Sequence, residues 1–199
     1  MTGIPRVATP ADAGTVTDLI VEAFYDDPTW SWAFPDPTLR RSQHRRFWRL
    51  FVDAAVRRQS AWLAAHETST SVWVPPGDVE LSPAEEELLE SLLSELLGSD
   101  AARVVEAFEL FEDAHPRDEP HFYLSLLATH PRHRGHGYGL QLLADNLAQV
   151  DERRLPAYLE ASNPANVPLY ERHGFRVVGL FDLPDGGPGV HTMWRDARA

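Results

Sequence analysis

The stretch that decides the fold is "RHRGHGYGLQLL", Arg132–Leu143, in which glycine occupies every second position from Gly135 to Gly139. The segment before it, "HFYLSLLATH", alternates apolar residues as a strand does, and the leucines after it recur at helical spacing. A strand, a glycine-rich turn and a helix in this order place bare backbone at a helix N-terminus. Such a turn favours an anion, because amide groups and the helix dipole both attract negative charge.

The loop departs from two well-known phosphate-binding patterns. A dinucleotide fingerprint G-x-G-x-x-G that starts at Gly135 meets Leu140 at its third glycine position, and a P-loop needs a lysine. All 18 basic residues of this chain are arginines. The loop is therefore interpreted as a turn whose amides face a pyrophosphate, with Arg132, Arg134 and His136 adding positive charge. The alternative is a tight connection in which the glycines serve packing alone.

The composition predicts a soluble globular protein with one domain over residues 1–199, since 43% of the residues are hydrophobic and 24% are charged. We expect a cytoplasmic protein without a membrane partner, because there is no apolar run of membrane-spanning length and the start lacks signal-peptide features. A net charge of -12 argues against nucleic-acid binding. The absence of cysteine excludes disulfides, thiolate metal sites and a cysteine nucleophile.

The other elements are expected in mixed order along the chain. Apolar periodicity and capping residues predict helices over residues 9–24, 38–59, 82–99 and 100–114, and a short helix within 163–175. Strands are predicted near 4–8, 157–162, 175–183 and 190–196, with a hairpin over 60–74. The segment 25–37, "YDDPTWSWAFPDP", contains three prolines and is predicted to be an aromatic loop.

Two stretches together resemble the GNAT superfamily of N-acetyltransferases. "LLATHPRHRGHGYG" is similar to the acetyl-CoA-binding signature of that superfamily, which is met by Pro131, Arg134, Gly137 and Gly139. "NPANVPLYERHGF" is similar to its second signature, which is met by Asn163, Leu169, Tyr170, Gly174 and Phe175. Stretches such as "VWVPP" also resemble the branch that contains puromycin N-acetyltransferase. Asn166 is a departure, because many members have alanine there.

The resemblance implies the fold and the cosubstrate. It implies an α/β fold with a GNAT-like mixed, mostly antiparallel central sheet flanked by helices, in which splayed strands hold acetyl-CoA. It also implies that the cosubstrate contacts the backbone of the strand before the loop, the loop itself and an asparagine; these residues are Leu127, Ala128, Thr129, Arg134, Gly135, His136, Gly137, Tyr138, Gly139, Leu140 and Asn163. Ordinary sheet pairing and a helix cap are the alternative roles for the strand residues and for Asn163.

Two residues are the candidates for proton transfer. Tyr170 matches the general acid of the family, and a phenol can protonate a thiolate of similar basicity. Packing on a short helix is its alternative role. Glu160 lies on the predicted strand beside the cosubstrate and is the candidate general base, with an arginine partner as the structural alternative.

The aromatic loop is the candidate wall of the acceptor site. Asp26 and Asp27 offer carboxylates to a cationic amine, and Trp30 and Trp32 offer cation–π contacts. The alternative is a helix-ending turn with a hydrophobic plug. His115 is a further candidate to face the acceptor. No metal site is expected, because no histidine pair has a ligand spacing such as H-E-x-x-H.

The predicted function is transfer of an acetyl group from acetyl-CoA to a small-molecule amine, such as an antibiotic or another natural product, by direct attack in a ternary complex. A protein or peptide N-acetyltransferase is one alternative, and a non-catalytic acyl-CoA-binding sensor is the other. A general acid at Tyr170 favours the enzyme over the sensor. The protein is expected to be a monomer or a homodimer.

Overall fold

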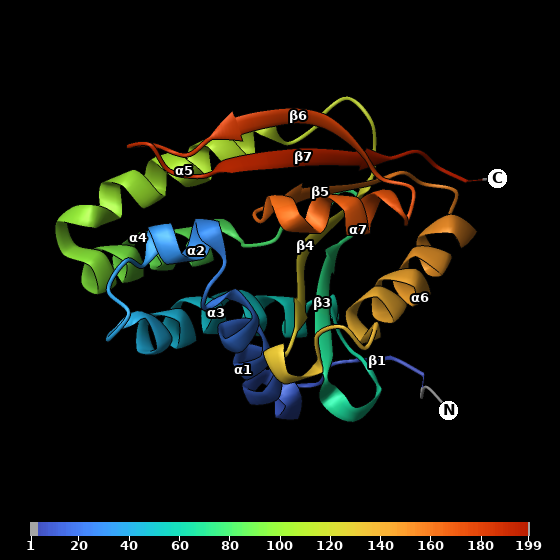
Figure 1. The fold of residues 1–199 in the computed structure, drawn as a ribbon, viewed down its shortest axis with the longest axis horizontal. Coiled ribbons are helices and arrows are strands. Elements are labelled where there is room, and N and C mark those ends of the chain that lie inside the picture. The colour runs from blue at the N-terminus through green and yellow to red at the C-terminus, as the bar shows by residue number, and fades with distance from the viewer. Residues whose placement is uncertain (1–3, 199) are drawn as a thin grey trace.

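The computed structural model describes residues 4–198 and contains a seven-stranded sheet with helices on both of its faces (Figure 1). The strand order is β1-β2-β3-β4-β5-β7-β6. The strands are β1 (Arg6–Val7), β2 (Ala61–Leu63), β3 (Ser69–Val74), β4 (Phe122–Thr129), β5 (Ala157–Ala161), β6 (Arg176–Asp182) and β7 (Gly189–Arg195). Only β4 and β5 are parallel, so the predicted mixed, mostly antiparallel sheet is confirmed.

The parallel pair β4–β5 separates soon after it begins. Phe122 pairs with Ala157 and Tyr123 pairs with Tyr158, and the register between the two strands ends there. From that point β4 pairs only with β3, whereas the rest of β5 pairs only with β7. The sheet therefore opens between the C-terminal ends of β4 and β5, which confirms the predicted splay.

Long helices cover both sides of the sheet (Figure 1). The first side carries α1 (Ala13–Phe24), α3 (Arg40–Arg57), α4 (Pro83–Leu97) and α5 (Ala101–Ala114). The other side carries α6 (Tyr138–Glu152), and the short helix α7 (Val167–Glu171) follows β5. Short 3-10 turns are η1 (Pro10–Asp12), η2 (Ala65–Glu67), η3 (Gly98–Asp100), η4 (Pro131–His133) and η5 (Pro164–Asn166).

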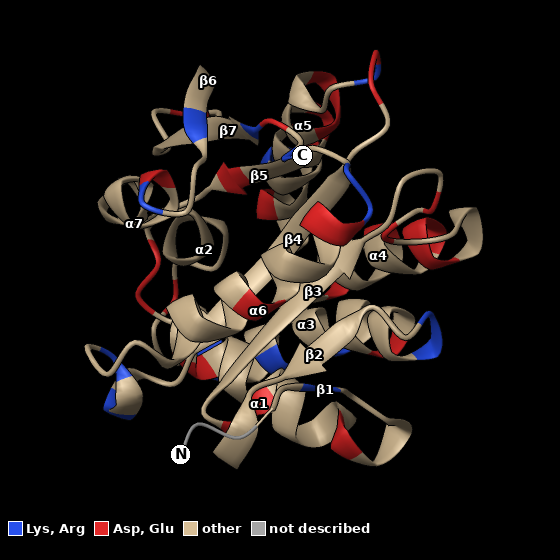
Figure 2. Ribbon diagram, turned by 90° about the vertical axis from the view of Figure 1, so that its right-hand side faces the viewer, with Lys and Arg blue, Asp and Glu red and all other residues tan. Residues whose placement is uncertain are grey.

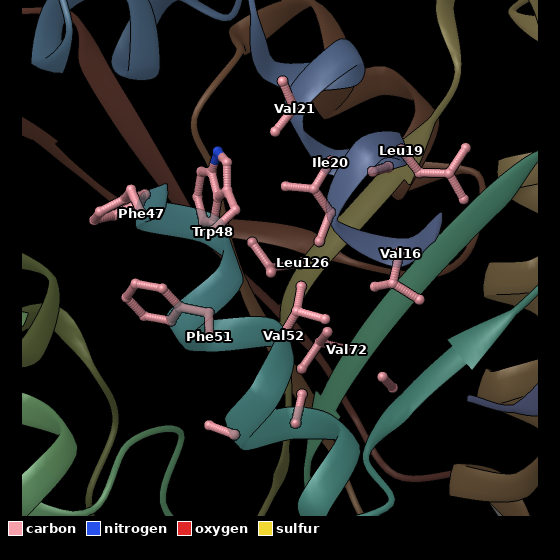
Figure 3. Packing of buried hydrophobic residues seen from close by; sticks show 14 of the residues in the cluster. Val16, Leu19, Ile20, Val21, Phe47, Trp48, Phe51, Val52, Val72 and Leu126 are labelled. Atoms are coloured by element: carbon pink, nitrogen blue, oxygen red, sulfur yellow. The ribbon is translucent and has the colours of Figure 1, made fainter. Parts of the chain in front are cut away.

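The core is divided between the two faces. Apolar residues of α1 and α3 pack on Val72 of β3 and Leu126 of β4 (Figure 3). On the opposite face, Leu143 and Leu147 of α6 pack against Leu159 of β5. The register of β3 with β4 shifts between Val72 and Trp73, which interrupts the alternation of side chains along β4. Leu124 therefore belongs to the core on the α6 side, whereas Leu126 belongs to the core on the α1 side.

The prediction for residues 25–37 is wrong in one respect. This segment contains a helix, α2 (Pro28–Ala33), which begins where the sequence suggested only a loop. Asp27 is the N-cap and accepts hydrogen bonds from the amides of Thr29 and Trp30, and Pro28 occupies the first helical position. Proline at that position does not interrupt a helix, because its missing N–H would have had no partner there. The three prolines therefore bound this helix rather than exclude it.

No helix within residues 4–198 is both long and apolar enough to cross a membrane.

Candidate functional site

Two glycines of the loop before α6 require a backbone that other residues rarely adopt. Gly135 and Gly137 both have φ of 79°, and Gly137 is the N-cap of α6. A Cβ atom at either position would meet no atom within 4 Å, so the space beside both residues is open. Open space and positive φ fit a ligand that approaches the backbone closely.

The amides at the start of α6 are available to that space. The first hydrogen bond of the helix runs from Gln141 N to Gly137 O at 2.8 Å. The N–H groups of residues 137–140 therefore have no partner within the helix. The loop is attached to α1, because the Arg134 side chain donates a hydrogen bond to the carbonyl of Ala23 at 2.7 Å. His136 is fixed too, with its Nδ1 3.0 Å from the carbonyl of Arg134.

Gly139 has a different role from the other two glycines. A Cβ at this position would lie 2.2 Å from Oγ1 of Thr129, which itself lies 3.1 Å from Oγ of Ser69. The third glycine therefore lets α6 approach the end of β4. This is the packing role that the sequence left as the alternative for the whole loop, and the structure gives it to this one residue.

The end of β4 presents one unpaired edge. Leu127, Ala128 and Thr129 pair with Ser71, Thr70 and Ser69 of β3. On their other side β5 has already diverged, so no strand pairs with that edge within the described residues. Backbone groups on such an edge can bind an extended ligand as an added strand would.

A cavity of about 1060 Å³ adjoins this edge. It lies at the opening of the sheet and extends under α4 and α5, and its walls include residues of β4, β5, α2, α3 and α7. Leu127, Glu160 and Tyr170 line it, as do Trp30 and His115. The structure thus brings the candidate acid, the candidate base and one strand residue to a single space.

Glu160 is enclosed at the base of this cavity. Its side chain is 4% exposed, and its Oε1 lies 3.8 Å from Nδ1 of His115. Burial, with the charges of Glu160 and Glu80, raises the pKa of Tyr123 well above its usual value. Burial and Glu160 likewise raise the pKa of Tyr158. Glu160 is the carboxylate around which these groups are arranged, and it has no arginine partner among the described ion pairs.

Glu80 is a second carboxylate that the sequence did not single out. It lies in the segment between β3 and α4, lines the same cavity and accepts a hydrogen bond from Ser125 of β4. Burial, together with the charge of Glu160, raises its pKa to about 7, although the Ser125 hydrogen bond acts in the opposite direction. Nothing in "PPGDVE" marked this residue, because only the pairing of β3 with β4 brings it beside Ser125.

Tyr170 remains protonated at neutral pH. It lies on α7 against Phe175, with 6.1 Å between the ring centroids, and it lines the cavity. Burial raises its pKa, and the nearby charge of Asp27 raises it further. A phenol in this state can donate a proton but is a poor base.

The other predicted acceptor residues have mixed placements. Asp27 caps α2, accepts a hydrogen bond from Ser162 at 2.9 Å, and has a pKa raised by burial. Trp30 lines the cavity and packs on Trp48, with 4.5 Å between the ring centroids. Asp26 is exposed and does not line it. Trp32 also lies elsewhere, with Arg103 4.4 Å from its ring centroid.

Asn163 acts as a cap in this structure. Its side chain accepts a hydrogen bond from the amide of Ala165 at 3.0 Å and so begins η5. This is the alternative role that the sequence left open, and it leaves the side-chain NH₂ group without a role in the cap.

Solved structures with the same fold include several acetyltransferases. One from Corynebacterium glutamicum, described as histone acetyltransferase HPA2 and related acetyltransferase, is 25% identical, with a TM-score of 0.68 over 100% of this chain and 98% of that one. A mosquito arylalkylamine N-acetyltransferase like 5b is 16% identical, with a TM-score of 0.66 over 96% and 98%. A Drosophila melanogaster polyamine N-acetyltransferase is 14% identical, with a TM-score of 0.63 over 97% and 99%.

The family model for the acetyltransferase (GNAT) family matches residues 62–175, more than half of the chain. The matched segment contains β4, the glycine loop, α6, Glu160 and Tyr170. The family generally uses acetyl-CoA as the acetyl donor. The sequence signatures, the splayed sheet and this match agree, and the chain belongs to the GNAT family of acetyltransferases.

Proposed function

We propose that this protein transfers an acetyl group from acetyl-CoA to a small-molecule amine by direct attack in a ternary complex. One observation carries the proposal. Glu160 and Tyr170, which have the chemistry of a base and an acid, line one cavity beside the unpaired edge of β4. A protein that only bound acyl-CoA would need the loop and the edge but would have no use for this pair.

The residues present fit the donor. The open space at Gly135 and Gly137 and the partnerless amides at the start of α6 suit the pyrophosphate. The free edge of Leu127, Ala128 and Thr129 suits the pantetheine arm, which carries amide groups. When bound there, acetyl-CoA supplies an activated acetyl group and a thiol leaving group.

Glu160 supports the proposal as the general base. An amine is protonated at neutral pH and has to lose a proton before it can attack. The side chain of Glu160 is 4% exposed and lines the cavity, where a bound ammonium group can reach it. Tyr170 is the matching acid, because the departing sulfur needs a proton and the hydroxyl keeps its own.

The walls of the cavity favour a cationic acceptor with an apolar part. Arg117 is the one arginine among the described lining residues, whereas ten lining residues are acidic: Asp78, Glu80, Glu86, Glu90, Glu109, Glu112, Asp113, Asp118, Glu119 and Glu160. Figure 2 shows acidic residues on α4, α5 and β5 around this region. Trp30, Phe108 and Phe111 supply the apolar surface. A positively charged amine with an aliphatic or aromatic portion matches both features.

The puromycin N-acetyltransferase branch stays a prediction, and puromycin is not singled out as the acceptor. A peptide acceptor is the alternative, since the Corynebacterium glutamicum structure is described as a histone acetyltransferase. The enclosed position of Glu160 favours a small molecule, because its side chain is 4% exposed and a lysine on a protein surface would have to extend into the cavity to reach it.

The test combines binding with turnover. Calorimetry should show that the purified protein binds CoA, and free-thiol release should be measured with acetyl-CoA against a panel of diamines, arylalkylamines, aminated antibiotics and lysine peptides. We expect turnover with cationic small molecules above that with peptides. Glu160→Gln should abolish most of it without weakening CoA binding, whereas Glu109→Gln, an exposed residue of the same cavity, should retain it. CoA binding without thiol release for any amine would favour the sensor.

A further inference from the structure

Two histidines meet behind Glu160. His115 is the C-cap of α5 and His121 lies just before β4, and their Nε2 atoms are 3.1 Å apart. The Nδ1 of His121 is 2.8 Å from the carbonyl of Glu119. The Nδ1 of His115 is 3.8 Å from Oε1 of Glu160. These contacts form a continuous row from the carboxylate to the segment 115–121.

The hydrogen bonds assign one tautomer to each ring. A carbonyl oxygen only accepts, so the proton of neutral His121 is on Nδ1. Burial lowers the pKa of His121, which keeps that ring neutral and its Nε2 unprotonated. The Nε2 of His115 must then be the donor in the contact between the rings. The remaining nitrogen of His115, Nδ1, is therefore its basic site and faces Glu160.

This arrangement places a lone pair opposite a carboxylate, which is repulsive unless a proton lies between them. The 3.8 Å gap is too long for a direct hydrogen bond, but it is a distance that a water molecule or a small ring movement closes. His115 is also the more accessible group, with a side chain 28% exposed against 4% for Glu160. A proton on Glu160 thus has a basic neighbour in His115, on the side toward solvent.

We propose that His115 removes the acceptor's proton from Glu160 and passes it to water, with His121 holding His115 in the tautomer that makes this possible. The inference rests on the proposed function. An ammonium acceptor and acetyl-CoA yield an amide, a thiol and one released proton; the N–C bond forms and the C–S bond breaks. The ammonium nitrogen loses its first proton to Glu160, and this released proton goes on to Nδ1 of His115 and then to solvent. Tyr170 supplies the thiol proton, and the second proton that the nitrogen loses as the amide forms restores the Tyr170 hydroxyl.

His115 and His121 are positioning residues here, because both act through Glu160. Other groups also face His115. Tyr123 of β4 and Tyr158 of β5 pack edge-on against its ring, with centroids 4.9 and 5.0 Å away, and Glu80 lies near enough for the charges to interact. Glu112 and Asp113 of α5 and Arg117, Asp118 and Glu119 of the following segment line the same cavity. Most of the charged groups around His115 are therefore acidic.

The tautomers can be measured without turnover. Long-range ¹H–¹⁵N spectra of the ¹⁵N-labelled full chain, assigned with His115→Gln and His121→Gln variants, should show His121 protonated at Nδ1 and neutral His115 protonated at Nε2. His121→Phe should leave His115 as a mixture of tautomers. The reverse assignment in the wild type, with the proton of His121 on Nε2, would overturn the proposal.

Proton transfer from Glu160 through His115 to solvent, called the relay below, is tested by the pH profile of kcat. His115→Ala should lower kcat by about 10²-fold, the lower end of what a proton transfer contributes, and added imidazole should restore part of it, more strongly as the pH rises. The KM for acetyl-CoA should not change. His121→Phe should give a smaller loss and an altered acidic limb. His66→Asn, on an exposed turn outside the cavity, is the control and should match the wild type.

The two proposals fail in different ways. If the wild type does not release thiol with any amine of the panel, the proposed function fails, and the proton transfer through His115 fails with it. If the wild type is active, but His115→Ala keeps its pH profile and does not respond to imidazole, the relay alone is overturned. A loss in His115→Ala that imidazole does not restore also overturns it, because packing rather than proton transfer would then explain the loss.

Discussion

A substitution at Gly137 should mainly weaken CoA binding, whereas a substitution at Gly139 should mainly lower the stability of the fold. Gly137 has φ of 79° and ψ of 2°, with open space where a Cβ would lie. Asparagine tolerates this region, so Gly137→Asn should cost under about 1 kcal/mol of unfolding free energy. Its side chain would nevertheless fill the space beside the amides. Losing one hydrogen bond from an amide to a phosphate is worth about 1.5–3 kcal/mol, which predicts a Kd for CoA about 10- to 100-fold higher.

Gly139→Ala should instead act on stability. Its Cβ would lie 2.2 Å from Oγ1 of Thr129, so β4 and α6 have to separate or the threonine has to rotate away from Ser69. Overpacking of this kind costs about 1–3 kcal/mol. Thr129→Ala removes the clashing atom, because the Thr129 Cβ would be 3.6 Å away. The double variant should therefore lose less stability than the sum of the two single variants.

The assays are urea denaturation and calorimetry with CoA on the same preparations. Gly14→Ala is the matched control, since Gly14 lies in α1 with open space around it, and this change should stabilise the protein by up to about 1 kcal/mol without affecting CoA binding. A folded Gly137→Asn protein with wild-type affinity for CoA would refute the assignment of the phosphates to this loop. Additive losses in the double variant would refute the packing role of Gly139.

Three further predictions follow from the site and its surroundings. Tyr170→Phe should lower kcat by about 10²-fold or more and leave the Kd for CoA unchanged; wild-type turnover would remove Tyr170 from the chemistry. Trp30→Phe should raise the KM for the acceptor, whereas Trp32→Phe, outside the cavity, should not; equal effects in steady-state kinetics would contradict the pocket. Burial would raise the pKa of Glu85, but hydrogen bonds from Arg58, Ser82 and Arg57 outweigh it and hold this pKa at about 2. The resulting stability, on the order of 2–3 kcal/mol, is present above pH 4.5 and is lost as the pH falls toward 2, and Glu85→Gln should remove this dependence in urea titrations.

Local patterns in the sequence predicted most of the fold. The helices and strands followed from apolar spacing and capping residues, and the two signatures predicted the splayed sheet. The helix α2 was missed because Pro28 was interpreted as a break, although Asp27 before it is an N-cap residue. Asp27 was predicted to bind a cationic amine because it is a carboxylate. In the structure this carboxylate accepts two amide hydrogen bonds as the N-cap of α2 and one hydrogen bond from Ser162.

The surroundings of the candidate base could not be predicted in the same way. Glu80, His115 and Glu160 come from three segments that only the sheet brings together. His115 was predicted to face the acceptor, and it does line the cavity, but its contact with His121 depends on how the segment 115–121 turns between α5 and β4. Such long-range placement has no periodic signal in a single sequence.

The opening between β4 and β5 is closed at both ends, and this explains why a gap in the sheet can persist. At one end the strands pair through Phe122 and Tyr123. At the other end, Thr29 donates to the carbonyl of Ser162 at 3.2 Å and Ser162 donates to Asp27 at 2.9 Å, which ties α2 to the segment after β5. Arg134 ties the glycine loop to the end of α1. Because unpaired edges invite collapse or wrong pairing, these ties hold the two halves of the sheet apart at a fixed width. Asp27 therefore contributes to the site by framing it, whichever amine the cavity takes.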